Sequence, residues 1–102
     1  MKNRSPLEML GSKNETLRIE DSSVIHKNRR GQERRILVAD IQRVKITPII
    51  SLPGISTIGL IMKNARKTIF GTNVDLVFYF EESSELPYAQ NIRDYIVEQI
   101  SS

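Results

Sequence analysis

The chain has 102 residues, a length that suffices for one domain with a single modest hydrophobic core. Its hydrophobic share of 39% and charged share of 26% are typical of globular proteins and argue against long disordered stretches. The net charge of +3 is a mild basic excess, which favours an anionic partner without requiring one. The sequence contains no cysteine, which excludes disulfides and thiolate metal sites and is compatible with a reducing compartment.

The sequence predicts neither a leader peptide nor a membrane span. Its first ten residues, MKNRSPLEML, carry positive charge but no long apolar run, so we do not expect a secretory signal. The most apolar stretch, 46–62, contains Pro48, Pro53 and Gly54 and is shorter than the roughly 20 residues that a spanning helix needs. We therefore expect a soluble, cytoplasmic protein.

Residues 1–14 differ in character from the rest of the chain. They are polar and are interrupted by Pro6 and Gly11, which break regular secondary structure. We interpret them as an N-terminal tail or one added strand, and we place the domain itself at residues 15–102.

From Thr16 onward, apolar and polar residues alternate, which is typical of half-buried β-strands. The turn "EDSS" at 20–23 separates the first two expected strands. Short strands at this regular spacing predict an antiparallel barrel or sandwich. The seven predicted strands cover 16–20, 24–29, 34–40, 41–47, 57–63, 67–72 and 74–80.

The pattern changes after Phe80 to the period of a helix. Ser83 or Ser84 can cap its start, Glu85 suits the positive end of the helix dipole, and Pro87 is tolerated in a first turn. One apolar stripe on this helix would cover an open end of a β-barrel. The pattern alone also fits another small β-rich domain with a terminal helix. The stripe consists of Ala89, Ile92, Ile96 and Ile100.

This order of elements, with four sequence stretches, resembles the pleckstrin-homology (PH) superfold and in particular its bacterial, GRAM-like branch. The stretches are "LRIEDSSVIHKNRR", "ILVADIQRVKI", "TIGLIM" and "NVDLVFYF", and the resemblance covers Glu15 to Ser101. It implies a mainly β fold, a seven-stranded antiparallel barrel or sandwich capped by one C-terminal α-helix. The second stretch is similar to the family's Ile-x-x-x-Asp-Ile-x-x-Val pattern, at Ile36, Asp40, Ile41 and Val44.

The resemblance implies a scaffold that binds lipids, peptides or copies of itself, and the fold does not choose among these. The best-known phosphoinositide site of PH domains uses basic residues that flank the first hairpin loop. The expected first loop here is "EDSS", in which Glu20 and Asp21 would repel a phosphate. We therefore expect that this lipid site does not carry over to any residue of the chain.

The sequence offers little for catalysis. His26 is its one histidine, and no hydrolase elbow, phosphate-binding loop or zinc-protease motif is present. The acids Glu81, Glu82 and Glu85 are better explained as the start of a helix than as a carboxylate site. We expect no enzymatic activity, no catalytic residues, no cofactor, no metal and no small-molecule substrate.

Two loops form a candidate contact surface. The basic loop, 27–35, turns at Gly31 and carries five cations against one acid. The apolar loop, 48–56, has more apolar side chains than we expect in a surface loop without a binding role. Because loops alternate between the two ends of an antiparallel meander, we expect both at the same end. The candidate residues are Lys27, Arg29, Arg30, Arg34, Arg35, Ile49, Ile50 and Leu52.

Several functions are open for this surface. We favour protein–protein contact or self-association of a non-catalytic module, through its strand edges, its terminal helix or the apolar loop, where an apolar centre would have a basic rim. The alternative is peripheral binding to an anionic membrane, with Ile50 and Leu52 inserted beside the basic residues. A third interpretation is that the charges are merely solvated and that the apolar loop is part of the core. We do not expect nucleic-acid binding, because no aromatic residue lies within 27–45.

Overall fold

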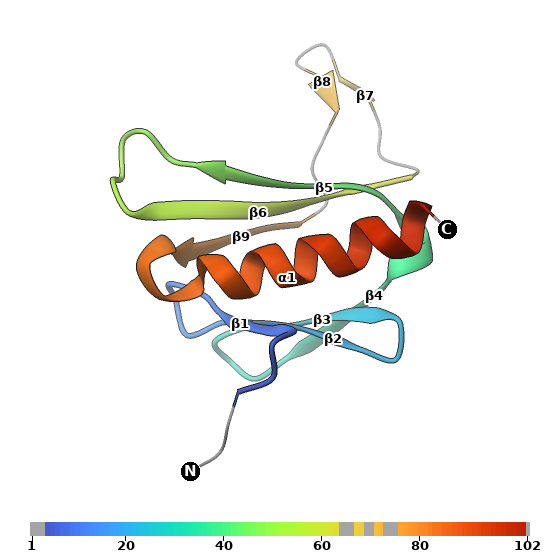
Figure 1. Cartoon of the computed structure of the whole chain (residues 1–102), viewed down its shortest axis with the longest axis horizontal. Coiled ribbons are helices and arrows are strands. Elements are labelled where there is room, and N and C mark those ends of the chain that lie inside the picture. The colour runs from blue at the N-terminus through green and yellow to red at the C-terminus, as the bar shows by residue number, and fades with distance from the viewer. Residues whose placement is uncertain (1–3, 64–66, 69–70, 73–75, 102) are drawn as a thin grey trace.

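The computed structural model describes residues 4–63, 67–68, 71–72 and 76–101, which form a mainly β fold with one C-terminal helix (Figure 1). The first sheet has four antiparallel strands in sequence order. These strands are β1 (Glu8–Leu10), β2 (Thr16–Glu20), β3 (Ser23–Lys27) and β4 (Glu33–Leu37).

The second sheet has three antiparallel strands, in the order β5-β6-β9. A short 3₁₀ helix, η1 (Val38–Asp40), leads from β4 into this sheet, and β7 and β8 pair as a separate hairpin. The helix α1 (Glu82–Ser101) follows β9 directly. The remaining strands are β5 (Ile41–Pro48), β6 (Ile55–Met62), β7 (Lys67–Thr68), β8 (Gly71–Thr72) and β9 (Leu76–Glu81).

One hydrophobic core joins the two sheets and the helix. Leu17 on β2, Phe78 on β9 and Ile92 on α1 illustrate it, since each is fully or almost fully buried. The helix contacts β1 of the first sheet and β5, β6 and β9 of the second, so its apolar stripe closes the space between them (Figure 1). The expected amphipathic helix is therefore confirmed, and α1 packs between two sheets. No helix within the described residues has the length and hydropathy needed to cross a bilayer.

The start of α1 differs from the expectation. The helix begins at Glu82, one residue before the predicted caps, and the Glu82 N–H donates to the Gly54 carbonyl at 2.9 Å. The buried hydroxyl of Ser56 donates to the Glu82 carboxylate. Glu82 at the helix start is therefore bonded to the β5–β6 loop through Gly54 and to β6 through Ser56. Pro87 lies inside the helix, beyond its first turn, where it removes an amide that would otherwise donate to the Ser83 carbonyl.

The N-terminal segment packs on α1. The Glu85 carboxylate, 5% exposed as a residue, accepts hydrogen bonds at 2.7 Å from both the Arg4 guanidinium and the Leu10 N–H. The Arg4 guanidinium lies 3.7 Å from the ring centre of Tyr88. Burial lowers the pKa of Arg4, but its hydrogen bonds to Glu85 and Tyr88 outweigh this effect and raise the pKa above its usual value. Glu85 therefore binds the N-terminal segment as well as suiting the helix dipole.

Several predicted strands have different limits. The strand expected at 24–29 ends at Lys27, and the strand expected at 34–40 ends at Leu37, where η1 begins. The segment 67–72, expected as one strand, contains β7 and β8, while residues 69–70 and 73–75 lie outside the described part of the chain. Within residues 1–14 the structure has the short strand β1, paired with β2. The described ladders form separate sheets of four, three and two strands.

Candidate contact surface

Three loops lie at one end of the fold, to the left in Figure 1. They are the β1–β2 loop (11–15), the β3–β4 loop (28–32) and the β5–β6 loop (49–54). We call these loops, together with Ile55 and Tyr79, the loop-end surface. The Ser12 N–H donates to the Tyr79 carbonyl on β9 at 3.0 Å, so the β1–β2 loop is bonded to the second sheet.

The first hollow of the loop-end surface is basic, and we call it the basic pocket. It has a volume of about 370 Å³, and three of its side chains are cations. Its one acid, Glu15, has a carboxylate oxygen 2.6 Å from His26 Nε2, and the His26 ring meets Phe78 edge-on. The pocket therefore presents an excess of positive charge. Its lining residues are Lys13, Glu15, Asn28, Arg29, Arg30 and Gln32.

The β3–β4 loop is held in shape by the Asn28 side chain and by two backbone hydrogen bonds of 2.9 Å, from Asn28 N–H to the Gln32 carbonyl and from Gly31 N–H to the Asn28 carbonyl. Asn28 Oδ1 accepts from the backbone N–H groups of Arg30 at 2.9 Å and Gln32 at 3.0 Å. The Asn28 side-chain amide donates to the Gln32 side-chain oxygen at 3.0 Å, and Gly31 turns the chain with a φ of 85°. Asparagine side chains commonly stabilise turns in this way. The two loop arginines are thus presented from an ordered turn.

The second hollow is apolar, and we call it the apolar hollow. It has a volume of about 340 Å³ and is lined by Leu52, Ile55 and Tyr79 together with Ser12 and Lys13. Lys13 lines both hollows, so the basic pocket and the apolar hollow adjoin at this residue. The expectation that a basic and an apolar loop lie at the same end agrees with this geometry.

The β5–β6 loop is a surface feature. Ile50 is 97% exposed and Leu52 is 52% exposed, so the interpretation of these two residues as core is wrong. Ile49 is half-buried, and its N–H donates to the Ile55 carbonyl at 3.0 Å. The physical reason is that the loop closes as its own turn, with Leu52 bonded to Ile49 and Ile55 bonded to Leu52 through the backbone. The loop does not fold back over the core.

The structure divides the five predicted cations among three places. Arg29 and Arg30 line the basic pocket. Lys27 and Arg35 lie on the outer face of the four-stranded sheet, because their register partners Glu33 and Ile25 alternate with the core residues Val24 and Ile36. Arg34 pairs with His26 in register and lies on the opposite face of β4 from Arg35. The five cations therefore do not form one cluster.

The structure corrects the expected position of the first hairpin. Since β1 precedes β2, the first hairpin loop is 11–15, and "EDSS" is the second hairpin, where Asp21 and Ser22 form the turn with φ of 51° and 60°. The acids Glu20 and Asp21 therefore say nothing about the first loop, which contains Lys13 and Glu15. The first hairpin loop therefore lies at 11–15 and not at 20–23, where we expected it.

Sequence reasoning missed Lys13, Ile55 and Tyr79 as members of this surface. The pattern "LEML" before "GSKNE" alternates Leu7 and Met9 with polar or exposed residues, and it was the available indication of a strand before the first loop. Tyr79 is exposed on the outer face of β9, between the buried Phe78 and Phe80. Its place beside Leu52 depends on the sheet register, in which Tyr79 faces Thr57.

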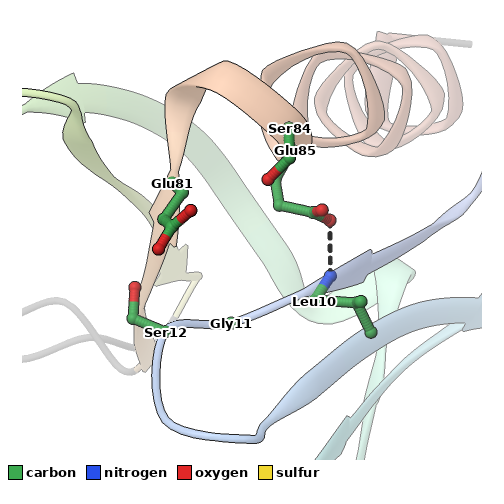
Figure 2. Close-up of a pocket in the computed structure, with 6 residues that line it drawn as sticks. All are labelled: Leu10, Gly11, Ser12, Glu81, Ser84 and Glu85. Atoms are coloured by element: carbon green, nitrogen blue, oxygen red, sulfur yellow. Dashed lines mark hydrogen bonds between the residues drawn. The ribbon is translucent and has the colours of Figure 1, made fainter.

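A third hollow, of about 220 Å³, lies between the first turn of α1 and the β1–β2 loop (Figure 2). Glu85 points toward β1 and bonds to the Leu10 N–H there, while Glu81 lies on the side of Ser12 (Figure 2). Its buried acid is thus already paired within the chain. Among the residues that the structure describes, no group of three or more histidines and acids is arranged to hold a metal ion.

No protein-family model matches the chain, and no curated protein matches it in sequence. The loop-end surface is therefore the main indication of function.

Proposed function

We propose that the chain is a PH-like, non-catalytic binding module that contacts a protein partner, or a second copy of itself, through the loop-end surface. The observation that carries this proposal is the meeting of the basic pocket and the apolar hollow at Lys13. An apolar centre with a basic, arginine-rich margin is the composition that protein interfaces favour.

The PH-like part of the proposal is supported by the order of the elements. Four antiparallel strands are followed by three, and one C-terminal helix packs against both sheets. The closure of these sheets into a barrel or sandwich is part of the proposal. So are a bacterial origin, which follows from the resemblance, and a cytoplasmic location, which agrees with the absence of cysteine.

The non-catalytic part is supported by the side chains that the loop-end surface brings together. They are cations, amides, apolar groups and the hydroxyls of Ser12 and Tyr79, and Glu15 and His26 are hydrogen-bonded to each other. A catalytic centre needs a nucleophile or base beside an orienting group and room for a reacting atom. The loop-end surface offers binding chemistry instead.

A second candidate function is peripheral binding to an anionic membrane. It is favoured by Ile50, which is 97% exposed at the tip of the β5–β6 loop, on the same surface as the basic pocket. Apolar side chains flanked by cations can bind a membrane of anionic lipids. Such binding weakens strongly as salt rises, whereas an apolar protein contact is nearly independent of salt.

The test of the protein contact uses the absence of native cysteine. The variants Leu52→Cys and Leu37→Cys place a unique label at two leucines that are both 52% exposed, one in the apolar hollow and one at the end of β4. Each is labelled with a photo-crosslinker and illuminated over a wide range of protein concentration. For self-association we expect a crosslinked dimer from the label at position 52 and not from the label at position 37.

Vesicle co-sedimentation tests the second candidate. The unlabelled protein is mixed with neutral vesicles and with phosphatidylserine-containing vesicles at low and at physiological salt. Binding only to the anionic vesicles, with loss at physiological salt, would support the membrane candidate. If such binding occurs while no crosslinked dimer forms and no peptide selected from a display library binds, the protein-contact proposal is wrong.

A further inference from the structure

We propose that the loop-end surface binds an extended peptide segment that carries one large apolar side chain next to acidic residues. The apolar side chain occupies the apolar hollow, and the acids pair with Lys13, Arg29 and Arg30 in the basic pocket. This inference rests on the proposed protein contact and names the chemistry of the partner.

The shape of the apolar hollow favours an inserted side chain. Its volume of about 340 Å³ lies at the lower end of the roughly 300–1,000 Å³ that is common for binding pockets. Leu52, Ile55 and Tyr79 give it an apolar lining, and the Tyr79 ring supplies a rigid wall. Aromatic and large aliphatic side chains contribute most of the affinity when they fill such a hollow at the centre of an interface.

The charge around the apolar hollow determines which peptide residues can lie next to the apolar side chain that fills it, which we call the anchor. Lys13 is shared by both hollows, and Arg29 and Arg30 follow it within the basic pocket. Glu15 is one acid against three cations in the pocket lining, so it compensates only part of this charge. Arginine and carboxylate groups form strong, directional hydrogen bonds, so aspartate or glutamate beside the anchor is the complementary chemistry.

The basic pocket is ordered before a partner arrives. Asn28 fixes the β3–β4 loop through its bonds to the Arg30 and Gln32 amides. The β1–β2 loop is fixed by the bond from Gly11 N–H to the Glu15 carbonyl at 2.7 Å and by the bond from Ser12 N–H to Tyr79. Since less conformational freedom is lost on binding, a short segment gains affinity from this order.

The same geometry favours a peptide over a bilayer. A concave hollow receives a protruding group, whereas insertion into a membrane requires side chains that protrude from the protein. Among the described residues of the β5–β6 loop, Ile50 is almost fully exposed, while Leu52 lines the hollow and Ile49 is half-buried. Burial of one inserted aliphatic side chain gives too little free energy to anchor a protein firmly.

The experiment is selection from a display library of random dodecapeptides on the immobilised full chain at physiological salt. We expect enrichment of peptides in which a Trp, Phe or Leu lies within a few residues of Asp or Glu. One enriched peptide is then labelled, and its dissociation constant is measured by fluorescence polarisation. Two variants alter the hollows, Leu52→Ser and Lys13→Glu, and we expect each to weaken binding about tenfold or more.

Two matched variants serve as controls. Leu37→Ser removes a leucine with the same 52% exposure, and Lys63→Glu reverses an exposed cation directly after β6, at the end of that strand opposite the β5–β6 loop. Both lie away from the two hollows, so we expect the dissociation constant to change by less than about twofold, as is usual for surface positions outside a contact. Circular dichroism of all four variants shows whether each is folded.

The outcomes distinguish failure of this inference from failure of the proposed function. Enriched peptides that lack acids but lose affinity in Leu52→Ser would refute this inference and leave the proposed contact through the loop-end surface intact. Enriched peptides whose affinity falls equally with the control variants would refute both, because the contact would then lie at another surface. No enrichment, with a crosslinked dimer from position 52, would also refute it and would identify a second copy as the occupant. No enrichment and no dimer, with salt-sensitive binding to phosphatidylserine vesicles, would overturn the proposed function together with this inference.

Discussion

The carboxylate of Glu85 accepts a hydrogen bond at 2.7 Å from the backbone N–H of Leu10, a residue 75 positions earlier in the chain. The same carboxylate oxygen also pairs with Arg4, so one buried acid on α1 binds both β1 and the segment before it. Because β1 is an edge strand of only three residues, this bond matters for its position. The β1–β2 loop, with Lys13, continues directly from β1.

We predict that Glu85→Ala destabilises the fold by about 1.5–3 kcal/mol, the usual cost of losing a hydrogen bond to a charged group. The change leaves the Leu10 N–H and the Arg4 guanidinium without this acceptor. Urea unfolding measures the loss. Glu85→Gln retains an acceptor and should cost less, and Glu98→Gln, at an exposed helix position, should cost nearly nothing. Equal stability of the Ala and Gln variants would contradict this role of the carboxylate.

Gly11 follows Leu10 directly and lies against the core. A Cβ added there would come within 2.6 Å of Phe78 Cζ, and Phe78 is 2% exposed. We predict that Gly11→Ala costs about 1–3 kcal/mol, as overpacking commonly does. The measurement is thermal and urea unfolding of the variant.

A double-mutant cycle with Phe78→Leu tests the cause, since the smaller side chain relieves the contact. The two changes together should cost less than the sum of their separate costs. Strict additivity would show that the loss at Gly11 comes from the backbone and not from Phe78.

Much of the fold could be predicted from local pattern. Alternation identified β2, β3, β5, β6 and β9, and the spacing of Ala89, Ile92 and Ile96 identified α1, because all of these bury one face along their own length. For residues 1–14 the sequence left a tail and an added strand open, because the three residues of β1 carry too little periodic information to decide between them. The helix start depends on bonds to Gly54 and Ser56, which are distant in sequence. A capping rule considers only residues next to the helix and therefore could not predict it.

The position of the loop-end surface could be predicted from the sequence, but its full set of residues could not. That the basic and apolar loops share one end followed from the alternation of hairpins. The period of two along a strand already separates Arg34 from Arg35, so a run of cations on a strand cannot form one patch. Lys13 and Tyr79 join the surface through the bond between Ser12 and β9, a tertiary contact that the sequence does not express locally.

Asn28 provides a prediction about the order of the basic pocket. Its Oδ1 accepts two backbone hydrogen bonds, so Asn28→Ala should free the Arg30 and Gln32 amides and destabilise the protein by about 1–2 kcal/mol. Hydrogen exchange of these two amides should accelerate, while that of the β2 amides stays slow. Asn28→Asp keeps the acceptor and should retain most of the protection. Unchanged exchange in Asn28→Ala would mean that the loop is held by other contacts.

Leu52 and Leu17 test whether the β5–β6 loop is surface or core. Leu52 is 52% exposed, whereas Leu17 is fully buried within the core cluster. We predict that Leu17→Ala costs about 2–5 kcal/mol, because it leaves a cavity. Leu52→Ala should change the free energy of unfolding by less than about 0.5 kcal/mol, as expected at an exposed site. Urea unfolding of both variants compares them directly, and a loss at Leu52 comparable to that at Leu17 would show that the loop is packed in the core in solution, in which case the apolar hollow would not be open to a partner.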